Sequence, residues 1–304
     1  MIARQLALLG LLVVACSTQQ SATPSPAPCK LAVIDGSPGF LTVPGGQFTA
    51  APDAGDGMYY DRSIRKWVPV GPPALSADGL ESVYIDGDTK TSKVHLVDLR
   101  SGNDRVVASG GPWQVAGLSP DALYVMRVEY VETNAYGRLA IGQGLWQVPL
   151  DGSAPVQLTS DARAWLWFAD GAVYGGGSTA DVAGGPNDIV RFDVQTMRQT
   201  TLFSRGVRSR LLAVDATGVA LIMGEATDRK LWLVSAAGDA VPVWSGGMDA
   251  PAPDYPFAVD GSDVWLSGAA PAHLWAIYHS SRAGGFQLVA TFNDHPVTVA
   301  GPCA

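Results

Sequence analysis

The stretch from Ala116 to Thr159 reads AGLSPDALYVMRVEYVETNAYGRLAIGQGLWQVPLDGSAPVQLT. It contains a Ser-Pro-Asp turn, an apolar strand, a loop, a second apolar strand, another turn and a third strand. Valine, leucine and aromatic residues at alternating positions suit strands that pack between neighbouring sheets. Because this unit recurs to the end of the chain, it decides the fold.

Two landmarks of the unit repeat with the same period. The first is a tight turn before an apolar strand, at Gly79, Ala122, Gly171, Gly218 and Gly261, with steps of 43, 49, 47 and 43 residues. The second is an alternating apolar strand that begins at Val94, Leu145, Ile189, Leu231 and Leu274, with steps of 51, 44, 42 and 43 residues. A period in the forties built from short strands is typical of a β-propeller blade.

The unit resembles the WD40-like repeat of TolB-type propellers. The residues that carry the resemblance are LSPD at Leu118–Asp121 and LWQVPLDGSAPVQLT at Leu145–Thr159, with weaker matches at Leu75–Gly79 and Lys93–Gly102. The later repeats drift, and Ala169-Asp170 replaces the Ser-Pro-Asp turn. The resemblance implies a fold and leaves function open, because this scaffold serves many tasks.

We therefore expect an all-β chain with a single β-propeller domain over residues 29–304. Six four-stranded blades are predicted, at residues 29–72, 73–113, 114–164, 165–209, 210–254 and 255–295. In the first blade, Leu41–Ala50 predicts a hairpin, and MYYD and KWVPV supply the next two strands. A strand in the tail Pro296–Ala304 is expected to pair with CKLAVI near the N-terminus and so close the ring. Seven blades are the alternative, if the two terminal strands form a separate partial blade.

The N-terminal residues predict export and a lipid anchor. Residues 1–15 have the pattern of a signal peptide, with Arg4 before an apolar run from Leu6 to Val14. Val-Val-Ala-Cys then resembles a bacterial lipobox, in which Cys16 becomes lipid-modified; an ordinary signal peptide is the alternative. Residues 16–28 form a Ser/Thr/Pro-rich tether. The protein is expected on the outer side of the cytoplasmic membrane, at the cell surface or in the periplasm.

Charge and cysteine content narrow the possible partners. The chain has 20 basic and 28 acidic residues, a net charge of −8, and no basic run, so we expect no nucleic-acid partner.

Two cysteines, Cys29 and Cys303, remain once Cys16 carries lipid. Because the compartment is expected to be oxidising and ring closure brings the two termini together, we predict a disulfide between them. We expect a monomeric domain that contacts the membrane only through its lipid.

The sequence contains no complete catalytic or metal-binding motif among the patterns considered. The four histidines, His95, His273, His279 and His295, form no ligand pair, and His95 and His273 fall in strand patterns. GGGSTA at Gly175–Ala180 lacks the last glycine of a nucleophile elbow. We therefore predict no catalytic residue, no metal and no cofactor.

The tryptophans are expected to pack between blades. Trp146, Trp232, Trp265 and Trp275 alternate with apolar neighbours, and Trp165 and Trp167 are predicted to share one strand face.

Loop length gives the better functional signal. In a four-stranded meander, the loop after strand two and the link to the next blade emerge on one rim, and the longest loops fall there. They are Glu129–Arg138, Gly175–Asn187, Ser204–Arg210 and Gly246–Tyr255. The candidate ligand-binding residues on this rim are Tyr130, Asn134, Tyr136, Arg163, Arg205, Arg208, Tyr255 and His295. Plain solvated connections are the alternative interpretation; a basic cluster there would favour an anionic ligand.

The leading functional hypothesis is a non-catalytic, lipid-anchored propeller that binds a protein, peptide or glycan outside the membrane. The alternative is a propeller hydrolase or lyase with its site at the central channel. A third possibility is an assembly or sensor subunit that works through a transmembrane partner.

Overall fold

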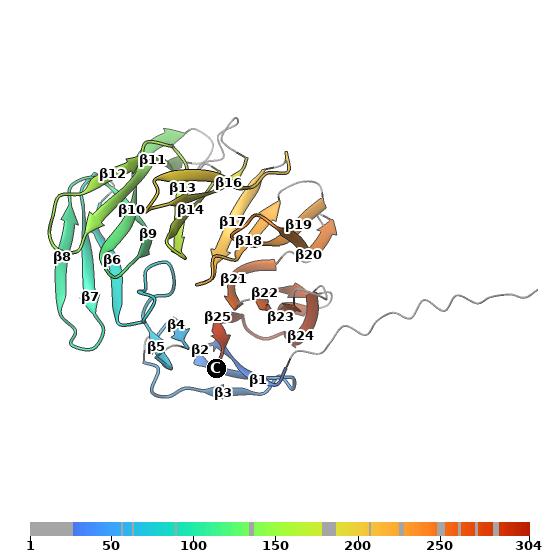
Figure 1. The fold of residues 1–304 in the computed structure, drawn as a ribbon. Coiled ribbons are helices and arrows are strands. Elements are labelled where there is room, and N and C mark those ends of the chain that lie inside the picture. Colours follow the sequence, from blue (N-terminus) through green and yellow to red (C-terminus); the bar gives the residue numbers. More distant parts are fainter. Residues whose placement is uncertain are drawn as a thin grey trace, which may run out of the picture.

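The structure is a computed structural model. It describes residues 27–55, 57–62, 64–88, 90–133, 137–177, 187–206, 208–224, 228–247, 253–260, 263–270, 273–281 and 286–304. The described residues form 25 strands, β1 to β25, and no helix. The strands group into sheets that stand side by side around a ring, so the fold is an all-β propeller (Figure 1).

Four consecutive sheets are four-stranded antiparallel meanders. The first comprises β9 (Trp113–Leu118), β10 (Ala122–Thr133), β11 (Gly137–Pro149) and β12 (Val156–Thr159). The second comprises β13 (Ala164–Ala169), β14 (Ala172–Gly176), β15 (Ile189–Asp193) and β16 (Arg198–Phe203). The third comprises β17 (Ser209–Val214), β18 (Ala220–Gly224), β19 (Asp228–Val234) and β20 (Ala240–Gly247). The fourth comprises β21 (Pro253–Asp260), β22 (Asp263–Ala270), β23 (His273–Ser281) and β24 (Phe286–Phe292). Each of these sheets begins one or two residues before the predicted blade and ends inside it.

The blade before them has three strands. Its strands are β6 (Glu81–Gly87), β7 (Ser92–Asp98) and β8 (Asp104–Ser109). An isolated antiparallel bridge between Leu75 and Ser82 marks the place of the innermost strand.

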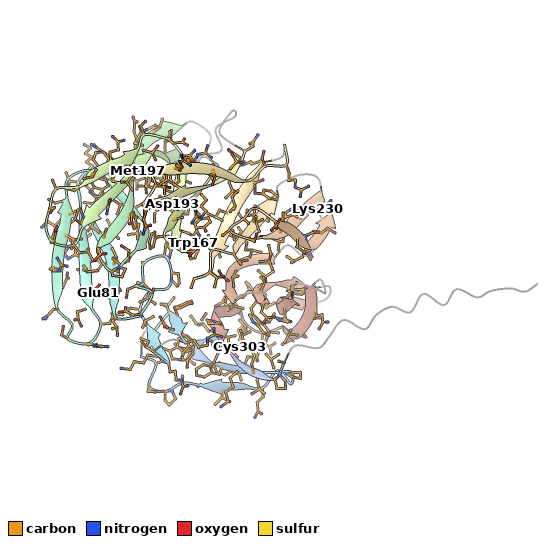
Figure 2. All side chains as sticks on the ribbon, in the orientation of Figure 1. Glu81, Trp167, Asp193, Met197, Lys230 and Cys303 are labelled. Atoms are coloured by element: carbon orange, nitrogen blue, oxygen red, sulfur yellow. A yellow bond between two sulfur atoms is a disulfide. The ribbon has the colours of Figure 1, made fainter. Side chains whose placement is uncertain are left out.

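The two ends of the chain close the ring within one sheet, as predicted. Its strands lie in the order β25 (Val297–Cys303), β1 (Cys29–Asp35), β2 (Ser37–Val43) and β3 (Phe48–Ala50). The C-terminal strand pairs antiparallel with β1, with Leu31 opposite Cys303 and Val33 opposite Val299. Figure 2 labels Cys303 where the C-terminal strand meets the N-terminal strands. The sulfur atoms of Cys29 and Cys303 lie 2.06 Å apart, at disulfide distance.

The prediction for MYYD and KWVPV needs correction. These segments contain β4 (Tyr59–Asp61) and β5 (Lys66–Val68), which form a separate two-stranded sheet rather than the outer strands of the first blade. The reason is that β25 joins the first blade, which is complete with β3. The described residues therefore form seven sheets, and the seventh is the β4–β5 pair. The seven-blade alternative supposed instead that the two terminal strands would form the extra blade.

Close contacts place β4 in the ring like the inner strand of a blade. A Cβ added at Gly117 in β9 would lie 2.3 Å from the Cβ of Phe168 in the next inner strand, β13. A Cβ added at Gly301 in β25 would lie 2.6 Å from the carbonyl oxygen of Tyr60 in β4. Glycine thus allows neighbouring inner strands to approach closely at both positions.

The turns have the chemistry that the first landmark indicated. Gly79, Gly171 and Gly218 adopt φ angles of 67°, 66° and 80°, in the left-handed region where glycine has no steric penalty. In the turn before β18, the Asp215 carboxylate accepts hydrogen bonds from the backbone N–H groups of Thr217 and Val219, both at 2.9 Å. Such turns start the apolar strand at the same place in successive blades.

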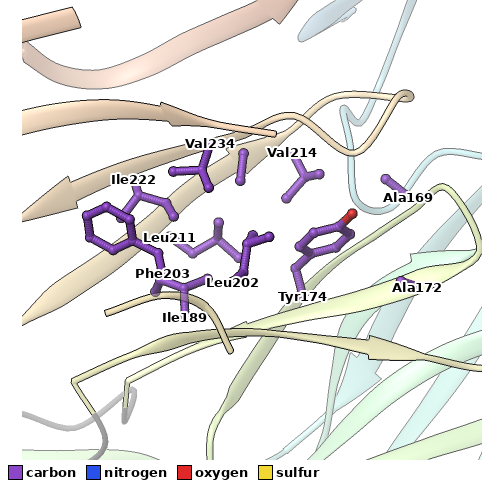
Figure 3. Packing of buried hydrophobic residues seen from close by; sticks show 11 residues of the cluster. Ala169, Ala172, Tyr174, Ile189, Leu202, Phe203, Leu211, Val214, Ile222 and Val234 are labelled. Atoms are coloured by element: carbon purple, nitrogen blue, oxygen red, sulfur yellow. The ribbon is translucent and has the colours of Figure 1, made fainter. Parts of the chain in front are cut away.

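The hydrophobic core lies between adjacent blades rather than within one sheet. Figure 3 shows the cluster between the β13–β16 and β17–β20 sheets, where Tyr174 and Ile189 of one blade face Leu211 and Ile222 of the next. Each of these four side chains is at most 3% exposed. A single blade could not bury its two faces, so stacking around the ring supplies the stabilising burial.

The prediction that Trp165 and Trp167 share a strand face is wrong. The register between β13 and β14 shifts between these two residues, which marks a β-bulge. An extra residue in one strand reverses the alternation of side chains beyond it. Trp165 consequently packs toward the preceding blade with Val173, whereas Trp167 packs in the clusters on the other side and is labelled near the ring centre in Figure 2.

Candidate functional site

An open cavity of about 630 Å³ lies on the rim that the long loops predicted. Its walls come from two neighbouring blades: Lys90 lies in the loop between β6 and β7, and Pro112 lies in the link from β8 to β9. The β9–β12 blade supplies the remaining residues, which are Arg127, Val128, Glu129, Tyr130, Gln143, Trp146 and Gln157. The cavity therefore exists only where the two blades meet.

The length of the β10–β11 hairpin positions this wall. Pairing of β9 with β10 ends at Arg127, opposite Trp113, and pairing of β12 with β11 ends at Leu145, opposite Thr159. The hairpin continues beyond both points and thus projects from the blade toward the rim. It carries Glu129, Tyr130 and Gln143 on the projecting part.

Two cations, Lys90 and Arg127, line this cavity. Lys90 and Arg127 are both exposed, and in the part of the chain that the structure describes neither forms an ion pair. The one carboxylate in the lining, Glu129, accepts a hydrogen bond of 3.0 Å from the amide of Gln143. The cavity wall therefore has a net positive charge in a chain of net charge −8.

Two indole groups lie at the base of the same region. Trp113 and Trp146 contact edge to face, with ring centroids 5.9 Å apart. Both indole N–H groups are buried, and neither has a hydrogen-bond acceptor among the described residues. Buried donors usually have a partner. Trp146 lines the cavity with its ring, and the site can offer donors from an ammonium, a guanidinium and two amides.

Of the predicted ligand-binding residues, Tyr130 lines the cavity and is 37% exposed. Arg163 lies on the same rim but is 8% exposed. Its Nε donates to Asp161 at 2.6 Å, and its Nη1 donates to the Asp188 carboxylate at 3.1 Å. Two carboxylates compensate its charge, and Arg163 joins the β12–β13 link to the start of β15.

Arg205 and Arg208 are exposed in the link between β16 and β17. The Arg205 guanidinium lies over the Trp232 ring, 4.8 Å from its centroid. His295 forms an ion pair with Asp35 across the ring-closing blade. These residues share the rim but do not line the cavity.

Asn134 and Tyr136 lie outside the described residues, as does the side chain of Tyr255, whose backbone belongs to β21. Cys16, the signal segment and residues 16–26 of the tether also lie outside them.

Sequence reasoning missed Lys90 and Arg127. One signal for Arg127 exists, because an arginine interrupts the apolar run ALYVM–V of β10. Nothing in the local sequence pairs it with Lys90, which lies in a different blade.

A second polar cluster lies on the exposed face of the β6–β8 blade. The Tyr84 hydroxyl donates to Asp104 at 2.6 Å, and His95 Nδ1 lies 2.9 Å from the same carboxylate. Tyr84 and His95 also stack, with centroids 4.5 Å apart. The hydrogen bonds from Tyr84 and His95 lower the pKa of Asp104, and the bond to Asp104 raises the pKa of Tyr84. The stack on Tyr84 and the contact with Asp104 give His95 a role in side-chain packing.

Within the described ranges, no group of three or more His, Cys, Asp or Glu side chains is placed to hold a metal ion. None of the described segments forms a helix long and apolar enough to span a membrane.

Comparisons with known proteins support the fold. No family model matches the sequence, and no curated protein matches it. Among solved structures, TolB from Acinetobacter baumannii is 15% identical with a TM-score of 0.52, over 87% of this chain and 62% of that chain. The acylaminoacyl peptidase of Pyrococcus horikoshii, in an orthorhombic crystal form, is 11% identical with a TM-score of 0.50, over 74% of this chain and 39% of that chain.

A further acylaminoacyl peptidase structure, in complex with Z-Gly-Gly-Phe-chloromethyl ketone, is 12% identical with a TM-score of 0.51, over 77% of this chain and 41% of that chain. The chain thus spans between 39% and 62% of the length of these structures. At such identities the likeness concerns the fold alone, which is a TolB-like β-propeller.

Proposed function

We propose that the protein is an extracytoplasmic, lipid-anchored β-propeller that binds a protein, peptide or glycan through its long-loop rim. The observation that carries the proposal is the inter-blade cavity on that rim, where Lys90 and Arg127 are exposed and form no ion pair among the described residues. A concave site on a rigid scaffold with a few convergent polar groups is the usual form of a binding site.

The proposed location outside the cytoplasm rests on separate observations. The signal-peptide pattern and the Val-Val-Ala-Cys run support export and lipid on Cys16. Cys29 and Cys303 at disulfide distance are consistent with an oxidising compartment outside the cytoplasm. A diacyl or triacyl adduct on Cys16 and a tether of residues 16–28 would hold the propeller near the membrane without spanning it.

The alternative is a hydrolase or lyase with its site at the central channel. The similar structures include both TolB and acylaminoacyl peptidases, and their likeness in fold does not choose between a binding module and an enzyme. We prefer the binding module because the cavity with two exposed cations lies between two blades on the rim. Metal analysis of the purified protein tests the alternative, because stoichiometric, tightly held Ca²⁺ or Zn²⁺ would favour an enzyme.

Site-specific photo-crosslinking in the native envelope tests the proposal. A photoreactive benzophenone residue replaces Tyr130 on the long-loop rim or, as the control, the exposed Ser153 in the β11–β12 turn on the opposite rim. We expect a discrete adduct from position 130 and none from position 153. An adduct from position 153 alone would place the binding face on the other rim and refute the proposal.

A further inference from the structure

The cavity between the β6–β8 and β9–β12 blades contains two positive charges, on Lys90 and Arg127. Arg127 extends from β10 beside Gly111, where a Cβ on the glycine would lie 3.4 Å from the arginine Nε. Lys90 follows a turn in which the Asp88 carboxylate accepts from the Lys90 and Thr91 backbone N–H groups at 2.7 and 2.8 Å. The turn therefore fixes the backbone that carries the ammonium group. Neither cation forms an ion pair among the described residues, although the exposed Asp88 carboxylate attracts Lys90 over a longer distance. Both cations are therefore available to an anionic ligand.

The remaining wall has planar polar groups and aromatic rings. Gln143 and Gln157 are exposed, and each amide can both donate and accept, as neighbouring hydroxyl groups of a sugar do. The indole N–H of Trp146 is buried, so a ligand in the cavity would contact the ring of Trp146 rather than its N–H group. Tyr130 and Trp146 offer aromatic surface, and the aliphatic lining is limited to Pro112 and Val128.

We infer that this cavity binds an acidic oligosaccharide, with the carboxylates of its sugar units against Lys90 and Arg127. The inference rests on the proposed function and names the ligand class of the same site. A cavity of about 630 Å³ matches a ligand of a few sugar rings. An acidic peptide is less favoured, because its hydrophobic side chains would find little aliphatic surface here.

Isothermal titration calorimetry with a defined probe tests the inference. The probe is a tetramer of mannuronic acid, and the matched neutral probe is the same tetramer with its carboxylates reduced to alcohols. We expect the full-length protein to bind the acidic tetramer and not the reduced one. Lys90→Ala and Arg127→Ala should each weaken binding about tenfold, since each removes a charge-assisted hydrogen bond.

Two exposed cations away from the cavity provide matched controls. Lys66→Ala in β5 and Arg198→Ala in β16 remove the same charges from the protein and should leave the affinity unchanged. Unchanged thermal midpoints for all four variants would show that folding is intact.

Three results would overturn the inference. Equal binding of the acidic and reduced tetramers would exclude carboxylate recognition. Binding of hexaglutamate with the same dependence on Lys90 and Arg127, without binding of the tetramer, would assign the cavity to acidic peptides. Absence of tetramer binding, together with an adduct from position 130 in the crosslinking experiment, would refute the ligand class and leave the proposed function standing.

Discussion

Arg163 donates a hydrogen bond of 3.1 Å to the carboxylate of Asp188, a residue 25 positions further along the chain. The same guanidinium donates to Asp161 at 2.6 Å, and Arg163 itself is 8% exposed. Burial opposes the charged form, but the hydrogen bonds with the two carboxylates outweigh it and raise the pKa of Arg163. This contact ties two connections on the long-loop rim to each other.

Replacing Arg163 with methionine should therefore destabilise the protein. The change leaves two partly buried carboxylates near each other without their shared cation, and we expect a loss of about 1–3 kcal/mol in the free energy of unfolding. Urea denaturation measures it. Arg198→Met, at an exposed position in β16, is the control and should have no measurable effect. Equal stability of the two variants would mean that Arg163 has no structural role.

The disulfide between Cys29 and Cys303 should stabilise the closed ring. The two residues are 274 positions apart, and a crosslink that closes so long a loop contributes roughly 3–5 kcal/mol in the chain-entropy model. Non-reducing peptide mapping should find the linked peptides, and the Cys29→Ser/Cys303→Ser double variant should unfold at a lower temperature. Two free thiols in the native protein would contradict the prediction.

Several turns depend on ionised aspartates, so stability should fall in acid. Hydrogen bonds from the backbone N–H groups of Thr91, Ser101 and Thr196 are the main reason why the pKa values of Asp88, Asp98 and Asp193 lie below the ordinary 3.8. A depressed carboxyl pKa gives stability that is present above the unfolded pKa and is lost as pH falls through the folded pKa.

We thus expect a thermal midpoint that is nearly constant from neutral pH to about pH 5 and falls below about pH 4. Asp193→Asn keeps a side-chain oxygen acceptor for the turn but removes the titrating group, so its midpoint should fall less steeply in acid than that of the unchanged protein. Scanning calorimetry across this range makes the comparison. Parallel curves for the two proteins would exclude a contribution from Asp193.

Cys16 should carry lipid in the mature protein. The motivation is the Val-Val-Ala-Cys sequence at the end of the apolar signal segment. Mass spectrometry of the membrane fraction should find an acylated N-terminal cysteine, and Cys16→Ser should release the propeller from the membrane. A soluble mature form that begins at another residue would argue for an ordinary signal peptide.

The outcome for individual residues shows which predictions local sequence can support. Turn glycines such as Gly171 and Gly218 were recognisable, because their role depends on backbone geometry within a few residues. The strand faces on which Trp165 and Trp167 lie could not be recognised, because a one-residue bulge in β13 reverses the alternation of side chains without a distinct sequence signal. The separate β4–β5 sheet was not predicted, because the number of strands that a blade takes from the adjacent sequence depends on whether a distant strand, here β25, completes that blade.

The sequence alone determined the propeller repeat, the approximate blade boundaries and the pairing of the two chain ends. These follow from the spacing of turns and the alternation of apolar residues, which are local properties that recur along the chain. Only the tertiary structure decided which charges are available on the rim. Arg163 forms an ion pair with Asp188, whereas Lys90 and Arg127, from two neighbouring blades, line one cavity. Such contacts join residues far apart in sequence, so no local pattern encodes them, and the stacking of blades alone brings them together.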